Sequence, residues 1–122
     1  MKKKFQILVA EDSDKKFTLI EFDISQVFGS DAEITRVKTL AELERVFSER
    51  SNEFTFIILD ASLEDGATLM FLDDEIRLNF KKPVVANSSS RRTRESQMEY
   101  GCTHEGGPRL YLSLESIKQN QQ

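Results

Sequence analysis

The sequence predicts a doubly wound α/β fold, in which helices cover both faces of a parallel five-stranded sheet. Strand-like and helix-like patterns alternate along the chain, and this alternation is typical of that class. The clearest strand patterns are unbroken apolar runs, as expected for strands that are buried on both faces. Because parallel strands are joined by right-handed crossovers, we expect the strand order 2-1-3-4-5. At 122 residues the chain fits one domain, 1–122, with no output domain.

The first three predicted elements rest on clear patterns. Residues 5–10 are apolar and predict a strand. Residues 14–28 carry Phe17, Ile20, Ile24 and Val27 at helical spacing, and Gly29 is a natural helix stop. Residues 32–37 alternate between apolar and polar side chains, which indicates a second strand.

The middle of the chain predicts two more helices and two more strands. Thr39 and Glu42 have the spacing of a capping box at the start of a second helix. The apolar run at 54–60 predicts a third strand, and after a turn at 64–66 the apolar residues at 69, 72, 76 and 80 predict a third helix. Residues 83–87 predict a short fourth strand, with Pro83 tolerated at its first position.

The C-terminal part is expected to be irregular. Residues 88–94 are polar and basic, and residues 95–100 suit a short helix that ends at Gly101. A fifth strand fits within 102–107 only if it is brief. Residues 110–117 have apolar side chains that suit either a strand or a helix, and we favour the helix.

Composition and charge exclude several classes of function. A formal charge of -4 argues against general nucleic-acid binding, because that activity needs a basic surface. The first apolar run breaks at Glu11 and Asp12, so it is too short for a secretory signal, and no stretch suits a membrane span. The single cysteine, Cys102, fits a reducing cytoplasm. We therefore expect a cytoplasmic protein with neither a nucleic-acid nor a membrane partner.

Three carboxylates follow two of the buried strands. Glu11 and Asp12 follow the first strand and Asp60 ends the third, so all three should meet at the carboxyl edge of the sheet. Crowded carboxylates repel one another unless a cation intervenes, and Mg²⁺ is bound by oxygen ligands of this kind. The simpler alternative is that Asp12 or Asp14 caps the following helix and that Asp60 caps a turn.

These residues resemble the receiver domain of bacterial response regulators, which has a flavodoxin-like (CheY-like) fold. Residues 7–13, ILVAEDS, are similar to the first strand and acidic pair of that family. Residues 57–63, IILDASL, are similar to the strand that presents the phosphoacceptor aspartate, and residues 83–88, PVVANS, resemble the fourth strand. The resemblance covers most of the chain as far as Tyr100.

The resemblance implies a role for each matching residue. Asp60 would be the phosphoacceptor, and Ser88 would form a hydrogen bond with the phosphoryl group. Glu11, Asp12 and Asp60 would bind Mg²⁺ together with the backbone carbonyl of Ser62. The partners would be a histidine kinase or histidine phosphotransfer protein and a downstream protein target. Such a protein phosphorylates itself from a phosphodonor and acts on no external substrate.

The sequence departs from the family pattern on one side of this site. Gly107-Pro108 stands where the family has lysine followed by proline, and Arg109 is the one nearby cation that could substitute. Glu64 and Thr68 replace a usual proline and a usual glycine. Because the acids and Ser88 are retained, a stand-alone receiver is the leading interpretation. Because the lysine is absent, a degenerate pseudo-receiver that binds proteins without phosphorylation is the alternative. A phosphatase of the haloacid dehalogenase type is distant, because Ser62 occupies the place of its second acid.

Overall fold

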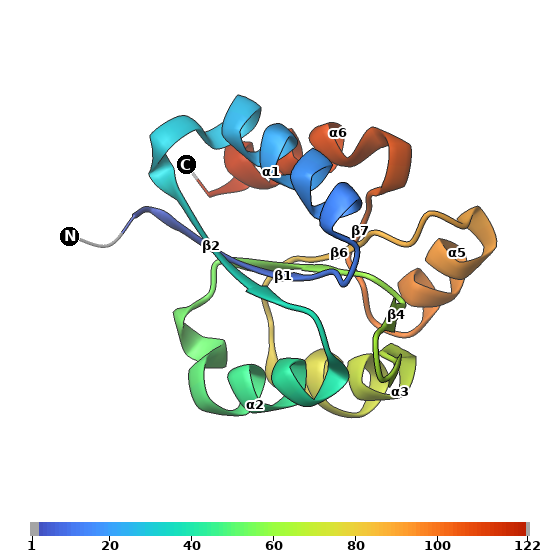
Figure 1. The fold of residues 1–122 in the computed structure, drawn as a ribbon. Coiled ribbons are helices and arrows are strands. Elements are labelled where there is room, and N and C mark those ends of the chain that lie inside the picture. Colours follow the sequence, from blue (N-terminus) through green and yellow to red (C-terminus); the bar gives the residue numbers. More distant parts are fainter. Residues whose placement is uncertain (1–2, 122) are drawn as a thin grey trace.

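A computed structural model describes residues 3–121 and shows a parallel sheet between two layers of helices (Figure 1). The sheet has five strands in the order β2-β1-β3-β6-β7, which is the predicted order 2-1-3-4-5 when only these strands are counted. All four neighbouring pairs in this sheet are parallel. The strands are β1 (Phe5–Ala10), β2 (Ala32–Val37), β3 (Phe56–Leu59), β6 (Val84–Ala86) and β7 (His104–Glu105).

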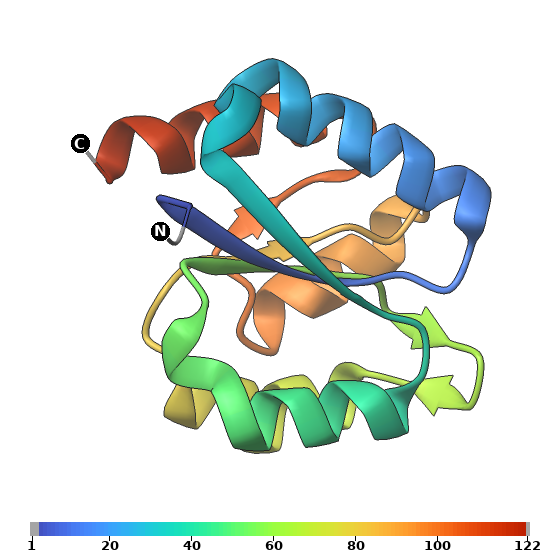
Figure 2. The ribbon, with the colours of Figure 1, turned by 60° about the vertical axis from the view of Figure 1, so that its left-hand side comes forward.

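The helices form two groups, one on each face of the sheet (Figure 2). One face is covered by α1 (Asp14–Phe28) and α6 (Leu110–Asn120), which pack against each other. The other face is covered by α2 (Leu40–Arg50), by a continuous helical stretch and by α5 (Arg91–Glu99). That stretch consists of α3 (Leu69–Phe71), η3 (Leu72–Ile76) and α4 (Arg77–Asn79). Short 3₁₀ turns are η1 (Gly29–Asp31), η2 (Ser51–Glu53) and η4 (Gly107–Arg109).

The core consists of two apolar layers separated by the sheet. Side chains alternate along β1, so Leu8 and Ala10 join the layer under α2 while Ile7 and Val9 join the layer under α1 and α6. Every residue of β1 and β3 is buried. The unbroken apolar runs in the sequence therefore correspond to central strands that are covered on both faces.

Local sequence signals set the ends of the first two helices. The Ser13 hydroxyl accepts a hydrogen bond from the Lys16 N–H at 3.2 Å and caps α1, and Gly29 ends the helix with φ 58°. The capping box of Thr39 and Glu42 is present at the start of α2. Helix α1 thus has the predicted bounds, and α2 begins at the predicted capping box.

The connection between β3 and α3 is more ordered than the predicted turn. The short strands β4 (Ser62–Leu63) and β5 (Gly66–Ala67) form a small antiparallel hairpin. The Asp65 carboxylate at its tip accepts hydrogen bonds from the first N–H groups of α2, at Leu40 and Ala41. This contact anchors the hairpin to the start of α2, because free N–H groups at a helix start need acceptors.

Two further elements differ from expectation, and two agree with it. The helix predicted over 69–80 contains a π-helical turn, η3, and α5 begins at Arg91 rather than at residue 95. The brief fifth strand is confirmed as the two-residue β7, and the favoured final helix is confirmed as α6. Within residues 3–121, no helix has both the length and the apolar character needed to cross a membrane.

Candidate functional site

The structure brings the three predicted carboxylates together at the carboxyl edge of the sheet. Glu11 and Asp12 follow β1, Asp60 follows β3, and the last residues of these strands, Ala10 and Leu59, are paired. One carboxylate oxygen from each of the three acids lies within 4.8 Å of the others. Glu11 is 1% exposed and Asp60 is 8% exposed, so two of the three charges have little access to water.

Burial changes the acidity of two of these groups. Burial, with a smaller contribution from the charge of Asp60, raises the pKa of Glu11 from 4.5 to about 7. Burial also raises the pKa of Asp60, although the nearby Lys16 ammonium opposes this shift. The Glu11 Oε2 atom accepts a hydrogen bond from the Ser13 N–H at 3.1 Å, whereas its Oε1 atom is buried without a hydrogen-bond partner in the described part of the chain.

The cation in this site is Lys16, in the first turn of α1. Its Nζ atom lies 3.4 Å from Glu11 Oε1 and 3.5 Å from Asp60 Oδ2, so it bridges the two buried acids. Arg109, the nearby cation that the sequence offers as a substitute, is exposed in η4 and makes no ion pair within residues 3–121. The sequence contains one signal for Lys16, because this residue lies only four residues after Asp12 and at the start of the helix that follows.

The simpler interpretation of Asp12 and Asp14 as helix caps is wrong, because Ser13 caps α1. Asp14 instead pairs with Arg36 at 2.9 Å and with Lys38 at 3.2 Å. Asp12 forms no hydrogen bond or ion pair with any residue in the range 3–121. Its carboxylate is therefore available to a ligand at the edge of the sheet.

Ser88 follows β6 and is buried, and its surroundings hold it firmly. Its hydroxyl accepts a hydrogen bond from the Ser90 N–H at 3.2 Å. Its N–H donates to Gln97 Oε1 at 3.3 Å, and its carbonyl accepts from Arg94 Nη1 at 2.8 Å. Arg94 is itself buried and pairs with Glu105 at 3.0 Å, although it belongs to a segment whose sequence is polar and basic.

Residues between Asp60 and α3 explain two departures from the family pattern. The Thr68 hydroxyl donates to the Asp60 carbonyl at 2.7 Å, and the Thr68 N–H donates to the Ala61 carbonyl at 2.9 Å. The Glu64 N–H donates to the Lys38 carbonyl at 3.3 Å, a hydrogen bond that proline cannot make. Ser62 lies two residues beyond Asp60, at the exposed start of β4. Both replacements thus fix the loop that presents Asp60.

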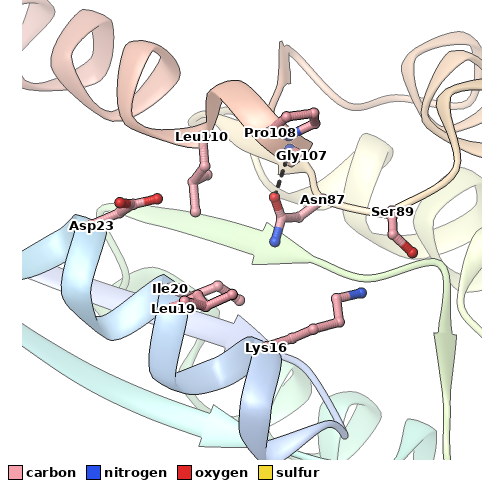
Figure 3. A pocket seen from close by; sticks show the side chains of 9 residues that line it. All are labelled: Lys16, Leu19, Ile20, Asp23, Asn87, Ser89, Gly107, Pro108 and Leu110. Carbon is pink, nitrogen blue, oxygen red and sulfur yellow. Dashed lines mark hydrogen bonds between the residues drawn. The ribbon is translucent and has the colours of Figure 1, made fainter.

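A pocket of about 300 Å³ lies between α1, the loop after β6 and η4 (Figure 3), and it is lined by Lys16, which pairs with Glu11 and Asp60. Lys16 reaches along one side, and Asn87, Ser89 and Gly107 line the other. Gly107 has φ 71°, and its N–H donates to Asn87 Oδ1 at 2.8 Å. Ser89 is therefore the serine that lines this pocket with Lys16, and Ser88 is not among its lining residues.

The donor set of the carboxylate cluster fits a small, hard divalent cation. All three side chains offer oxygen atoms, which suit Mg²⁺ better than softer metals. The buried Glu11 Oε1 atom lacks a hydrogen bond, and a cation at the cluster would satisfy it. Repulsion between the acids would fall at the same time.

Comparison with solved structures identifies the fold. The receiver domain of HemR from Leptospira biflexa matches with a TM-score of 0.70 at 20% identity, over 97% of this chain and 93% of that domain. The phosphorylated cyanobacterial phytochrome response regulator RcpA matches with a TM-score of 0.74 at 19% identity, over 98% of this chain and 93% of its own. The Mn²⁺-bound form of the response regulator Rcp1 matches with a TM-score of 0.71 at 20% identity, over 94% and 92% respectively.

The likeness lies in the structure and not in closely related sequences. The sequence matches no protein-family model and no curated protein. The structural matches nevertheless span nearly the whole of both chains in each comparison. Together with the sheet order and the position of the acids, they show that this chain has the fold of response-regulator receiver domains.

Proposed function

We propose that the protein is a stand-alone receiver that accepts a phosphoryl group on Asp60 and acts through protein contacts. The observation that carries this proposal is the meeting of Glu11, Asp12 and Asp60 at the carboxyl edge of a receiver-fold sheet. Asp60 is the central acid of the proposed reaction because it directly follows β3 and has a carboxylate oxygen beside the pocket cation Lys16.

The proposed reaction transfers a phosphoryl group between two side chains. A carboxylate oxygen of Asp60 forms a bond to phosphorus while the phosphorus–nitrogen bond of a phosphohistidine breaks. The bonding electron pair leaves with the imidazole nitrogen, so the donor histidine is regenerated. The Ser88 hydroxyl, or the Ser89 hydroxyl that lines the pocket, would donate a hydrogen bond to a phosphoryl oxygen.

Glu11, Asp12 and Asp60, with the Ser62 carbonyl, would hold Mg²⁺. When bound there, the ion would neutralise negative charge on the phosphoryl oxygens. Rcp1, a protein of similar fold, is known in an Mn²⁺-bound form, and RcpA is known in a phosphorylated form. Both support the proposal that this edge of the sheet binds a divalent cation and a phosphoryl group.

The proposed partners are a histidine kinase or histidine phosphotransfer protein and a downstream protein target in the cytoplasm. A protein donor must place its histidine against the edge that carries Asp60. Beside that edge, Leu19 on α1 is 62% exposed and lines the pocket together with the exposed Pro108. Exposed apolar side chains around a reactive group suit contact with a protein donor.

A second candidate function is a pseudo-receiver that binds its target without phosphorylation. The observation that favours it is the firm hold on the loop after β6, where Gln97 and Arg94 bind the backbone of Ser88. A loop that is already fixed has less freedom to report the state of Asp60.

Intact mass measurement after incubation with phosphoramidate and Mg²⁺ tests the proposal. The wild type and the Asp74→Asn control should each gain one phosphoryl group, because Asp74 is an exposed acid on the far helical stretch. Asp60→Asn should gain none. An unmodified wild type would favour the pseudo-receiver, and equal labelling of Asp60→Asn would place the phosphoryl group elsewhere.

A further inference from the structure

We propose that Lys16 is the cation that contacts the phosphoryl group on Asp60, in place of a lysine at position 107. This inference rests on the proposed phosphorylation of Asp60. It assigns to α1 a contact that the resemblance would place on the fifth strand.

The first observation is the position of the Lys16 ammonium. Its Nζ atom lies 3.5 Å from Asp60 Oδ2 and 3.4 Å from Glu11 Oε1. Among residues 3–121, Lys16 is the only lysine or arginine that forms an ion pair with Asp60. Its side chain is 33% exposed, so the ammonium lies between buried acids and solvent. A group that enters from solvent to react with Asp60 would therefore meet Lys16.

The second observation is that position 107 cannot present a cation to Asp60 in this backbone. Gly107 has φ 71°, a conformation that a side chain disfavours. A Cβ atom there would lie 2.7 Å from Arg94 Nη1, so the side-chain direction is already filled by a buried guanidinium. The approach to Asp60 must therefore be served by a residue from another element.

Arg94 and Arg109, the cations nearest to the loop after β6 and to η4, do not line the pocket shown in Figure 3. Arg94 binds the Ser88 carbonyl and pairs with Glu105. Arg109 lines a different pocket, with Arg91 and Glu105, and does not line the pocket that contains Lys16. Lys16 does line that pocket, and Gly107 and Ser89 lie across it (Figure 3). The pocket of about 300 Å³ has room for a phosphoryl group, and Lys16 contributes its cation.

The chemistry of lysine suits this role. An ammonium group has three donors on a flexible four-carbon stem, so it can leave one carboxylate oxygen and donate to a phosphoryl oxygen. The ammonium acts only as a hydrogen-bond donor, and no covalent bond to it forms or breaks. In the unphosphorylated protein the same ammonium offsets the repulsion between Glu11 and Asp60. It therefore competes with any divalent cation that binds these acids.

Two effects of opposite sign follow from removal of the ammonium. Without Lys16 the acids should bind Mg²⁺ more tightly, because a competing positive charge is gone. A phosphoryl mimic on Asp60 should bind more weakly, because a charged hydrogen-bond donor is gone. General damage to the fold would weaken both kinds of binding. The combination of tighter metal binding and weaker mimic binding is thus specific to the proposed role.

The test compares Lys16→Gln with the matched control Lys15→Gln, which removes the same charge from an exposed neighbour in the same helical turn. Dissociation constants are measured for Mg²⁺ alone and for beryllofluoride at saturating Mg²⁺. For Lys16→Gln we expect beryllofluoride binding to weaken about tenfold, as for loss of one hydrogen bond to a charged group, and Mg²⁺ binding to tighten. Lys16→Arg should recover part of the loss, and Lys15→Gln should match the wild type.

The outcomes separate this inference from the proposed function. If the wild type binds beryllofluoride and Lys16→Gln binds it as well as Lys15→Gln does, the role of Lys16 is refuted while Asp60 remains a phosphoacceptor. If Mg²⁺ and beryllofluoride binding both weaken in Lys16→Gln, the residue has only a structural role. If the wild type binds no beryllofluoride, the proposed function fails and the inference fails with it.

Discussion

The buried Glu11 carboxylate should make the metal-free protein less stable as the pH rises. Its pKa in the folded protein is about 7, raised from 4.5 mainly by burial. Between these two values the folded state holds a proton that the unfolded state has released. The contribution of Glu11 to the free energy of unfolding is therefore greatest below about pH 4.5. It falls as the pH rises through this window and levels off above about pH 7.

The size of the effect follows from the shift. A rise from 4.5 to about 7 corresponds to about 3 kcal/mol, since each pKa unit is worth about 1.4 kcal/mol. Glu11→Gln removes the titrating group, and its amide oxygen can still accept the hydrogen bond from the Ser13 N–H. We therefore expect Glu11→Gln to be more stable than the wild type at pH 8 by up to about 3 kcal/mol, with little difference near pH 4.5.

Urea unfolding in the presence of a chelator measures this difference. The free energy of unfolding of wild type and Glu11→Gln is compared at several values between pH 4.5 and pH 8. Comparison at each pH cancels the titration of other groups that the two proteins share. Glu21→Gln, a change at an exposed position of α1, is the control. A difference between Glu11→Gln and wild type that stays constant with pH would refute the reasoning.

Three further predictions concern the site and the loop beside it. Mg²⁺ should raise the melting temperature of the wild type by linkage and should leave the melting temperature of Asp12→Asn unchanged. Without metal, Asp12→Asn should be more stable than the wild type, because repulsion between the acids is smaller. An unchanged wild-type midpoint would count against a metal site. Gln97→Ala should lower the free energy of unfolding in urea by about 2–4 kcal/mol, because the wholly buried amide forms hydrogen bonds with the Leu59 carbonyl and the Ser88 N–H. A decrease below about 1 kcal/mol would show that these hydrogen bonds contribute little to stability. Hydrogen exchange across residues 88–112 should change little on addition of beryllofluoride, because the proposed cation lies on α1 and the loop after β6 is already held by hydrogen bonds. A large change would show that η4 and α5 change conformation when the site is occupied.

The elements that could be predicted from the sequence are those set by local patterns. The bounds of α1 follow from its apolar spacing and from Gly29, and α2 begins at the capping box of Thr39. The central strands were recognisable because each is a continuous apolar run, and their order followed from the crossover rule. The meeting of Glu11, Asp12 and Asp60 then required no information beyond that order.

The features that could not be predicted depend on contacts between distant residues. The β4–β5 hairpin has only two residues in each strand and is held by Asp65 against the start of α2, more than twenty residues earlier. Arg94 lies in a polar and basic stretch of the sequence, but Glu105 and the Ser88 carbonyl supply partners that allow its burial. The ion pairs of Lys16 depend on how α1 crosses the edge of the sheet, which no local pattern in the sequence shows.

The central claim is that Asp60 itself carries the phosphoryl group. Reduction with borohydride after incubation with phosphoramidate and Mg²⁺ converts an aspartyl phosphate to homoserine, which peptide mass analysis then locates. We predict homoserine at position 60 and an unchanged side chain at Asp12, although both acids belong to the same cluster. Homoserine at another position, or no homoserine under conditions that fully phosphorylate a receiver used as positive control, would contradict the account.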